Sequence, residues 1–321
     1  MPAMRHPPLA AILASLILLT LVGCERPAAP TVRAVAPAAS PVTESAVPGA
    51  DSDGMDGLMA EAFPAWKADR FAVLKVPAPD SPKERMTVAI HPATVVKLDA
   101  AHRALVTVGH PSEGTDENTA SHGDPAVVGV YLFELRKGRW FKTRAQDAVV
   151  WSGSSGELDG IDVAELGAGH PALLVKGSYG GQGETIDALD VVEVEPAGAR
   201  VVLPGLQVHE DLFGGASQGC EDWVKGLREP TDEELANEFE SQCQEVTGQW
   251  RIEPAGESGR GDIVVAYKSH GVEVDPETHL NAFVVADETV RYRYSASGYV
   301  KLEAKRAEPA SAVSPSASSP A

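Results

Sequence analysis

An internal repeat is the feature of this sequence that most constrains its fold. Residues 97–109 match residues 165–177 without a gap. Both segments begin with small and polar residues and continue as an apolar run, a pattern that predicts a tight turn leading into a buried strand. A polar loop with glycine follows each time, and then a predicted hairpin, over 130–143 in the first copy and 189–203 in the second. The chain is therefore expected to repeat a strand–loop–hairpin unit.

A third copy of this unit lies near the end of the sequence. It consists of a strand over 262–267, a long polar loop and a hairpin over 290–302. Each hairpin has a glycine in its turn, where the backbone needs a positive φ that other residues rarely adopt. Two short strands are predicted upstream, over 71–76 and 86–91. Such units predict an all-β fold of antiparallel strands.

The strand–loop–hairpin unit is similar to the FG-GAP-type repeats of β-propellers. The resemblance implies a propeller-like arrangement of antiparallel sheets. The chain departs from that family at the calcium-binding run Asp-x-Asp-x-Asp-Gly, of which residues 158–162 hold only a fragment. Three copies are also fewer than a closed propeller normally has, so a β-sandwich is an equal alternative.

The amino-terminal segment has the order of an export signal. Arg5 gives it a positive start, and residues 9–22 are apolar apart from one Ser and one Thr. This run is shorter than the roughly 20 residues that span a bilayer, but it fits the apolar region of a signal peptide. The segment ends in Leu-Val-Gly-Cys at 21–24, which resembles the lipobox of bacterial lipoproteins. The alternative is an ordinary cleaved signal with a chance cysteine.

The lipobox resemblance implies that the thiol of Cys24 carries a diacylglycerol and that cleavage occurs just before this residue. In that family an Asp after the lipidated cysteine retains the protein at the inner membrane, whereas this chain has Glu25. The periplasmic face of the outer membrane is therefore favoured over the inner membrane. The expected parts of the chain are a signal peptide over 1–23, the lipidated cysteine with a disordered Pro/Ala-rich tether over 24–60, an all-β periplasmic domain over 61–306 and a disordered tail over 307–321.

The two remaining cysteines, Cys220 and Cys243, predict a disulfide because the periplasm is oxidising. Two free thiols are the alternative. The sequence Thr-Asp-Glu-Glu at 231–234 has the form of a capping box and predicts a helix that ends near Gly248. The disulfide would pin this inserted helix to the loop around Cys220.

The best candidate for a ligand contact is the glycine-rich loop that holds Ser178, Tyr179, Gln182 and Glu184. Its backbone could fit around a ligand, and Tyr179 could stack on a sugar. The alternative is a wide hairpin connection without a ligand.

Other polar groups are better explained as structure than as chemistry. His-Glu-Asp at 209–211 would point to opposite faces of a strand. His102 and His170 occupy equivalent turns of the repeat, where exposed turn residues are expected. The acidic run 51–57 lacks the spacing of an EF-hand and predicts a solvated turn, and a short helix broken by a proline is expected over 58–66. No catalytic residue, metal site or cofactor is predicted.

The formal net charge of −19 argues against nucleic acid as a binding partner. Nucleic-acid binding depends on basic patches, and the sequence has no cluster of Lys or Arg. The sequence therefore favours a non-enzymatic envelope lipoprotein, held to the membrane through lipid on Cys24, that binds or scaffolds an envelope protein or glycan. The alternative is a periplasmic hydrolase that acts on envelope glycan or peptide.

Overall fold

The computed structural model describes residues 52–66, 71–81, 83–181, 183–212, 218–235, 243–256, 258–274, 281–302 and 304–306. Cys24, the expected signal peptide, most of the expected tether and the expected tail lie outside these residues. Among the residues described, no helix is long and apolar enough to cross a bilayer.

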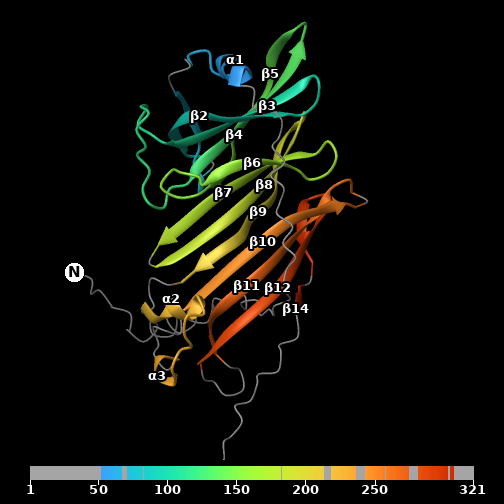
Figure 1. Cartoon of the computed structure of the whole chain (residues 1–321). Coiled ribbons are helices and arrows are strands. Elements are labelled where there is room, and N and C mark those ends of the chain that lie inside the picture. Colours follow the sequence, from blue (N-terminus) through green and yellow to red (C-terminus); the bar gives the residue numbers. More distant parts are fainter. Residues whose placement is uncertain are drawn as a thin grey trace, which may run out of the picture. The chain divides into compact units, whose positions relative to one another are not determined.

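Two antiparallel sheets form the described part of the chain (Figure 1). The first sheet has five strands, β1 (Ala72–Pro77), β2 (Arg85–Lys97), β3 (His102–Pro111), β4 (Ala126–Arg136) and β5 (Arg139–Ser152). The second has nine, β6 (Gly160–Glu165), β7 (Pro171–Gly181), β8 (Glu184–Glu195), β9 (Gly198–Asp211), β10 (Gln244–Ala255), β11 (Gly261–Val274), β12 (Asn281–Ser295), β13 (Gly298–Lys301) and β14 (Lys305–Arg306). The described helices are α1 (Ser52–Ala62), α2 (Gln218–Val224) and α3 (Asp232–Leu235).

The predicted repeat and the all-β fold are confirmed. Three four-stranded meanders follow one another, β2–β5, β6–β9 and β10–β13, and each ends in the hairpin that the sequence predicts. β9 pairs with β10 over three residue pairs, so the second and third meanders share one sheet. In the first hairpin turn, Lys137 and Gly138 both have positive φ, of 51° and 76°, which is the backbone of a type I′ turn.

The tight turns that begin the first two copies are also confirmed. In the first, the Asp99 carboxylate accepts the backbone N–H groups of Ala101 and His102. In the second, His170 donates its backbone N–H to the Gly167 carbonyl, and Leu166 donates to His170. An Asp side chain that accepts hydrogen bonds from backbone N–H groups ahead of it commonly closes a turn. The second copy has no such side chain at this position, and backbone hydrogen bonds close its turn instead.

Three apolar clusters stabilise these sheets. One lies between α1 and the first sheet, where Leu58 and Met59 are fully buried against Leu105 and Tyr131. Another joins the two sheets, with Val106 on one side and residues such as Val192 on the other. The third lies within the second sheet, where side chains of β7–β9 pack against those of β11–β13, so this sheet curls around its own apolar face.

Some predicted elements were wrong. The acidic run 51–57 was expected as a solvated turn, but from Ser52 onward it belongs to α1. The described parts of the long polar loop expected in the third copy are instead strand, because β11 continues to Val274 and β12 starts at Asn281. The strand predicted over 86–91 continues through Pro92 to Lys97, because a bulge in β2 accommodates the proline.

The predicted inserted helix is described only over α3, and residues 236–242 lie outside the described residues. Its capping box is confirmed, because Thr231 and Glu234 exchange side-chain and backbone hydrogen bonds. However, β10 starts at Gln244, and Gly248 pairs with Tyr267 in the sheet. The predicted disulfide between Cys220 and Cys243 is present, and it joins helix α2 to the residue just before β10. The inserted helix therefore does not extend to Gly248 as predicted, because the chain pairs with β11 from Gln244 onward.

Candidate functional site

The segment predicted to contact a ligand is a hairpin of two long strands rather than a wide loop. Ser178 and Tyr179 lie in β7 and Glu184 lies in β8, directly opposite Gly181. Gln182 lies outside the described residues. Because neighbouring residues of a strand face opposite ways, Ser178 and Tyr179 point to different faces of the sheet. Ser178 and Tyr179, which were predicted to contact one ligand, therefore cannot line the same site.

Tyr179 belongs to the face that meets the turn after β5. Its hydroxyl accepts the backbone N–H of Gly153 at 3.1 Å and lies 3.4 Å from the Ser152 hydroxyl. The phenol thus holds the turn over residues 152–156. Its side chain is engaged in a structural contact, although the residue is 38% exposed.

Ser178 lines a cavity of about 360 Å³ on the opposite face. This face carries the apolar cluster of the curled sheet, to which Leu189 and Trp250 belong. The cavity is lined by Asp159, Lys176, Ser178, Asp187, Ala188, Leu189, Val208 and Trp250. It therefore combines an apolar floor, one half-buried indole and a polar rim, the composition typical of small-molecule sites.

Two carboxylates on the rim share one hydroxyl. The Ser178 Oγ lies 2.5 Å from Asp159 Oδ2 and 2.6 Å from Asp187 Oδ1. A hydroxyl carries a single hydrogen and can donate to only one acceptor at a time. One carboxylate oxygen is thus left with spare acceptor capacity beside the cavity, which a hydroxyl or ammonium group of a ligand can use.

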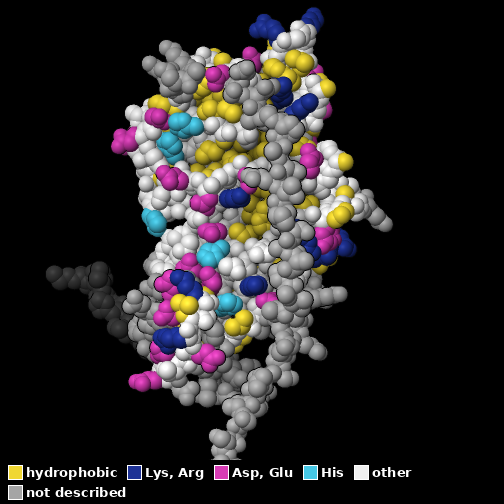
Figure 2. Space-filling view, viewed as in Figure 1, with side chains coloured by type: hydrophobic (Ala, Val, Ile, Leu, Met, Phe, Trp, Pro, Cys, Tyr) yellow, Lys and Arg dark blue, Asp and Glu magenta, His cyan; other side chains and the backbone are white. Residues whose placement is uncertain are grey.

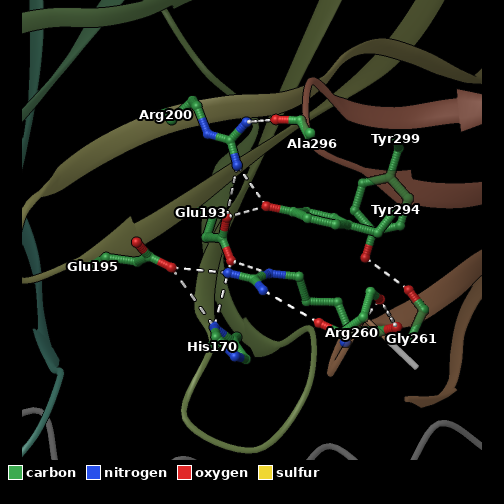
Figure 3. Close-up of polar contacts among 10 residues, drawn as sticks. His170, Glu193, Glu195, Arg200, Arg260, Gly261, Tyr294, Ala296 and Tyr299 are labelled. Atoms are coloured by element: carbon green, nitrogen blue, oxygen red, sulfur yellow. Dashed lines mark hydrogen bonds and ion pairs between the residues drawn. The ribbon is translucent and has the colours of Figure 1, made fainter. Parts of the chain in front are cut away.

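A second polar group surrounds Glu193, which is 2% exposed (Figure 3). Arg260 Nε donates to Glu193 at 2.6 Å, and its Nη2 donates to Glu195 at 2.9 Å. Tyr294 donates its hydroxyl to Glu193 at 2.6 Å, and Arg200 donates to the same oxygen at 3.2 Å. These residues come from β8, β9, the turn before β11, and β12. The network therefore ties the second meander to the third.

The network compensates the buried charge within itself. Burial opposes ionisation of Glu193, but hydrogen bonds from Tyr294, Arg260 and Arg200, together with the positive charge of Arg260, outweigh it and hold the pKa of Glu193 below its usual range. Burial and the hydrogen bond to Glu193 raise the pKa of Tyr294. A carboxylate whose partners are all in place has a structural role, so we assign the network to stability.

Two groups of three described residues have ligand atoms close enough to hold a metal ion. One is His170 with Glu193 and Glu195, where the Arg260 guanidinium already supplies the positive charge. The other is His91 with His110 and Asp116. Histidine side chains also lie next to acidic ones on the face drawn in Figure 2.

The other polar groups that the sequence singled out lie in strands and turns, as expected, but two details differ from the prediction. His209 and Asp211 lie on one face of β9, 3.3 Å apart, while Glu210 faces the other way and bonds Gln207. His102 pairs with Asp99 in its own turn at 2.8 Å. His170 differs from it, because its half-buried ring faces the Glu193 network instead of solvent.

Sequence reasoning missed the residues that complete both sites. Asp159 belongs to the 158–162 fragment that was set aside for lacking a calcium motif, and Trp250 stands in a segment that was expected to lie just after a helix. For His91 and His110, the available signal was Pro92, because a proline inside a strand marks a bulge or an edge. No protein-family model matches the chain, and no curated protein or solved structure shows significant similarity to it.

Proposed function

We propose that this chain is a lipid-anchored protein of the bacterial envelope whose β-domain binds another envelope component. The anchor is supported by the apolar leader and by the lipobox-like sequence that ends at Cys24. The disulfide between Cys220 and Cys243 supports an oxidising compartment such as the periplasm. Glu25 favours the periplasmic face of the outer membrane.

The cavity beside Trp250 is the observation that carries the binding proposal. An indole offers a flat apolar surface to the face of a sugar ring, while carboxylate and ammonium groups accept from and donate to its hydroxyls. Trp250, Lys176 and the Asp159–Ser178–Asp187 group provide these elements around one space. An envelope glycan is therefore the ligand class that the cavity fits best.

The anchor is tested with Cys24→Ser in cells fed a labelled fatty acid. The wild-type chain should take up label and fractionate with membranes, while the variant should do neither. Glu25→Asp is the matched control, because it should keep the label and shift the chain toward the inner membrane. A Cys24→Ser chain that is labelled and fractionates like wild type would refute the anchor.

The binding site is tested by titrating soluble peptidoglycan fragments into the full chain in detergent and following the heat of binding. Trp250→Ala should abolish the signal, because it removes the stacking surface. Tyr179→Phe is the control, because this ring lies on the other face of the sheet and should leave the affinity unchanged. Equal affinity of the Trp250→Ala and wild-type chains would exclude the cavity as the site.

The spacing of the two carboxylates favours glycoside hydrolysis as a second candidate. Because both contact the Ser178 hydroxyl, their contacting oxygens are at most roughly 5 Å apart, and this limit lies at the lower end of the separation of about 5–5.5 Å in retaining glycosidases. However, the hydroxyl occupies the space between them, which leaves no room there for a glycosidic bond. Binding is therefore preferred, and release of sugar products that stops in Asp187→Asn would reverse this preference.

A further inference from the structure

We propose that His91, His110 and Asp116 form a binding site for a divalent transition-metal ion, with Zn²⁺ as the best fit. The site lies on the first sheet and is independent of the cavity beside Trp250. Two imidazoles and one carboxylate are ligands that zinc commonly takes.

A bulge in β2 brings the two histidines to the same face of the sheet. Near the β2–β3 turn, Lys97 pairs with Arg103, and this register would place His91 opposite Gly109. The register shifts between Pro92 and Thr94, which leaves Ala93 as an extra residue, and His91 pairs with Val108 instead. Since alternate residues of a strand share a face, His110 then lies beside His91. Their rings stack at 5.5 Å between centroids, with planes 23° apart.

The loop between β3 and β4 places the carboxylate over this pair. Ser112 donates its hydroxyl to the Thr115 carbonyl at 2.6 Å and accepts the Gly114 backbone N–H, which fixes the loop just before Asp116. Farther along, Asn118 donates its amide to the Ser155 carbonyl at 2.8 Å. The loop is thus fastened by hydrogen bonds on both sides of Asp116.

The ligand atoms have spacings that suit a metal ion. His91 Nε2 lies 2.8 Å from Asp116 Oδ1, and His110 Nε2 lies 3.1 Å from the Asp116 carbonyl. One ligand atom from each of the three side chains lies within 4.8 Å of the other two. Zinc bonds of about 2.0–2.1 Å in a tetrahedral site need ligand atoms roughly 3.4 Å apart, a spacing that lies between the 2.8 Å of His91 and Asp116 and the 4.8 Å within which all three ligand atoms lie.

The charge of this group also suits a cation. With neutral rings its three side chains carry one negative charge, whereas in the His170 group Arg260 supplies a positive charge to the carboxylates. His110 in addition lines a cavity of about 410 Å³, together with Ala93 and the segment around Glu157. Three protein ligands leave one zinc position open, so an anionic or carbonyl group held in this cavity could reach the metal.

The test measures Zn²⁺ binding to the full chain in detergent by competition with a chromophoric chelator. Wild type should bind one equivalent more than a triple variant with His91→Ala, His110→Ala and Asp116→Asn. Each single substitution should weaken binding by at least about tenfold, the effect that even outer partners of a metal site can have. His102→Ala is the matched control, since this histidine also pairs with an Asp and should leave the extra equivalent intact.

Two further measurements keep the proposal falsifiable if a strand variant fails to fold. Asp116→Asn changes only an exposed loop residue and should by itself weaken binding. The electron paramagnetic resonance spectrum of bound Cu²⁺ should show hyperfine splitting from the nitrogen atoms of two imidazoles. This splitting should be absent from the spectrum of the triple variant. Unchanged Zn²⁺ affinity in Asp116→Asn, or uptake by the triple variant equal to that of wild type, would overturn the proposal.

Discussion

Replacing Glu193 by Gln should destabilise the fold strongly, because this carboxylate is the centre of a buried network. The substitution keeps the size of the side chain and removes its charge. Hydrogen bonds to a charged group contribute about 1.5–3 kcal/mol each and neutral ones about 0.5–1.5 kcal/mol, so each bond to Glu193 should lose roughly 1 kcal/mol. The bonds from Arg260 and Tyr294 are well screened from water, whereas the Arg200 side chain is 47% exposed and should count for little. We therefore expect a loss of about 2–3 kcal/mol, slightly below the usual cost of breaking a buried pair.

Urea unfolding followed by tryptophan fluorescence can measure this loss. The chain has five tryptophans, all within described residues, and the slope of the transition should not change if the substitution affects stability alone. Glu195→Gln is the matched control, because its carboxylate is 43% exposed although it also pairs with Arg260. It should cost less than about 1 kcal/mol. Equal losses in the two variants would refute the view that burial makes Glu193 the central group.

The pH dependence provides a second check of the same prediction. The pKa of Glu193 is lower in the folded chain than in the unfolded one, so its stabilisation is complete above the unfolded value, which is about 4.3 for a free Glu side chain. It is lost as the pH falls through the folded value. The difference between wild type and Glu193→Gln should therefore shrink below roughly pH 4. A difference that stays constant down to acid unfolding would mean that the charge contributes nothing.

Two other substitutions test separate parts of the fold. Cys220→Ser together with Cys243→Ser should lower the free energy of unfolding by about 3 kcal/mol, because the disulfide closes a loop with a sequence separation of 23; calorimetry would measure it, and reduction of wild type should give the same loss. Leu58→Ala should cost about 2–5 kcal/mol in urea unfolding, because this fully buried residue fixes α1 to the first sheet, whereas a cost near zero would show that α1 belongs with the tether.

The repeat let the sequence predict the strands, because each unit carries both an apolar run and a glycine turn. Pairing that depends on distant partners was not predictable in the same way. The sequence predicted a helix that ends near Gly248, yet β11 offers a row of backbone partners from Gln244 onward, and Gly248 pairs with Tyr267 in the sheet. The disulfide could be predicted because only two cysteines remain after Cys24.

The candidate sites were harder to predict because they depend on register. A bulge at Ala93 decides whether His91 and His110 share a face, and although Pro92 signals a bulge or an edge, it does not fix the one-residue shift in register. The cavity could not be predicted for a related reason. Trp250 and Ser178 line the same space because the second sheet curls around its apolar face. Ser178 was predicted to contact a ligand and lines this cavity, but as neighbours in β7, Ser178 and Tyr179 point to opposite faces of the sheet.

A comparison of the two repeat copies shows how the second meander is joined to the third. Asp99 of the first copy corresponds to Gly167 in the second, and His102 corresponds to His170. Without a carboxylate in the turn, the His170 ring faces Glu193 instead. Without a side chain, Gly167 lets another backbone approach, because a Cβ there would lie 1.9 Å from the Gly259 carbonyl oxygen.

Gly167→Ala should therefore act at the junction of the two meanders and not on the turn itself. A methyl group at this position meets backbone rather than a movable side chain, so we expect an overpacking cost of about 1–3 kcal/mol in urea unfolding. Gly169→Ala would confuse the comparison because its φ is 76°, whereas Gly57→Ala adds its methyl group in open space and is the better control. The displaced segment carries Arg260, so Gly167→Ala combined with Glu193→Gln should cost less than the two separate losses together. Strict additivity of the two losses would show that the close approach at Gly167 and the ion pairs of Glu193 stabilise different parts of the chain.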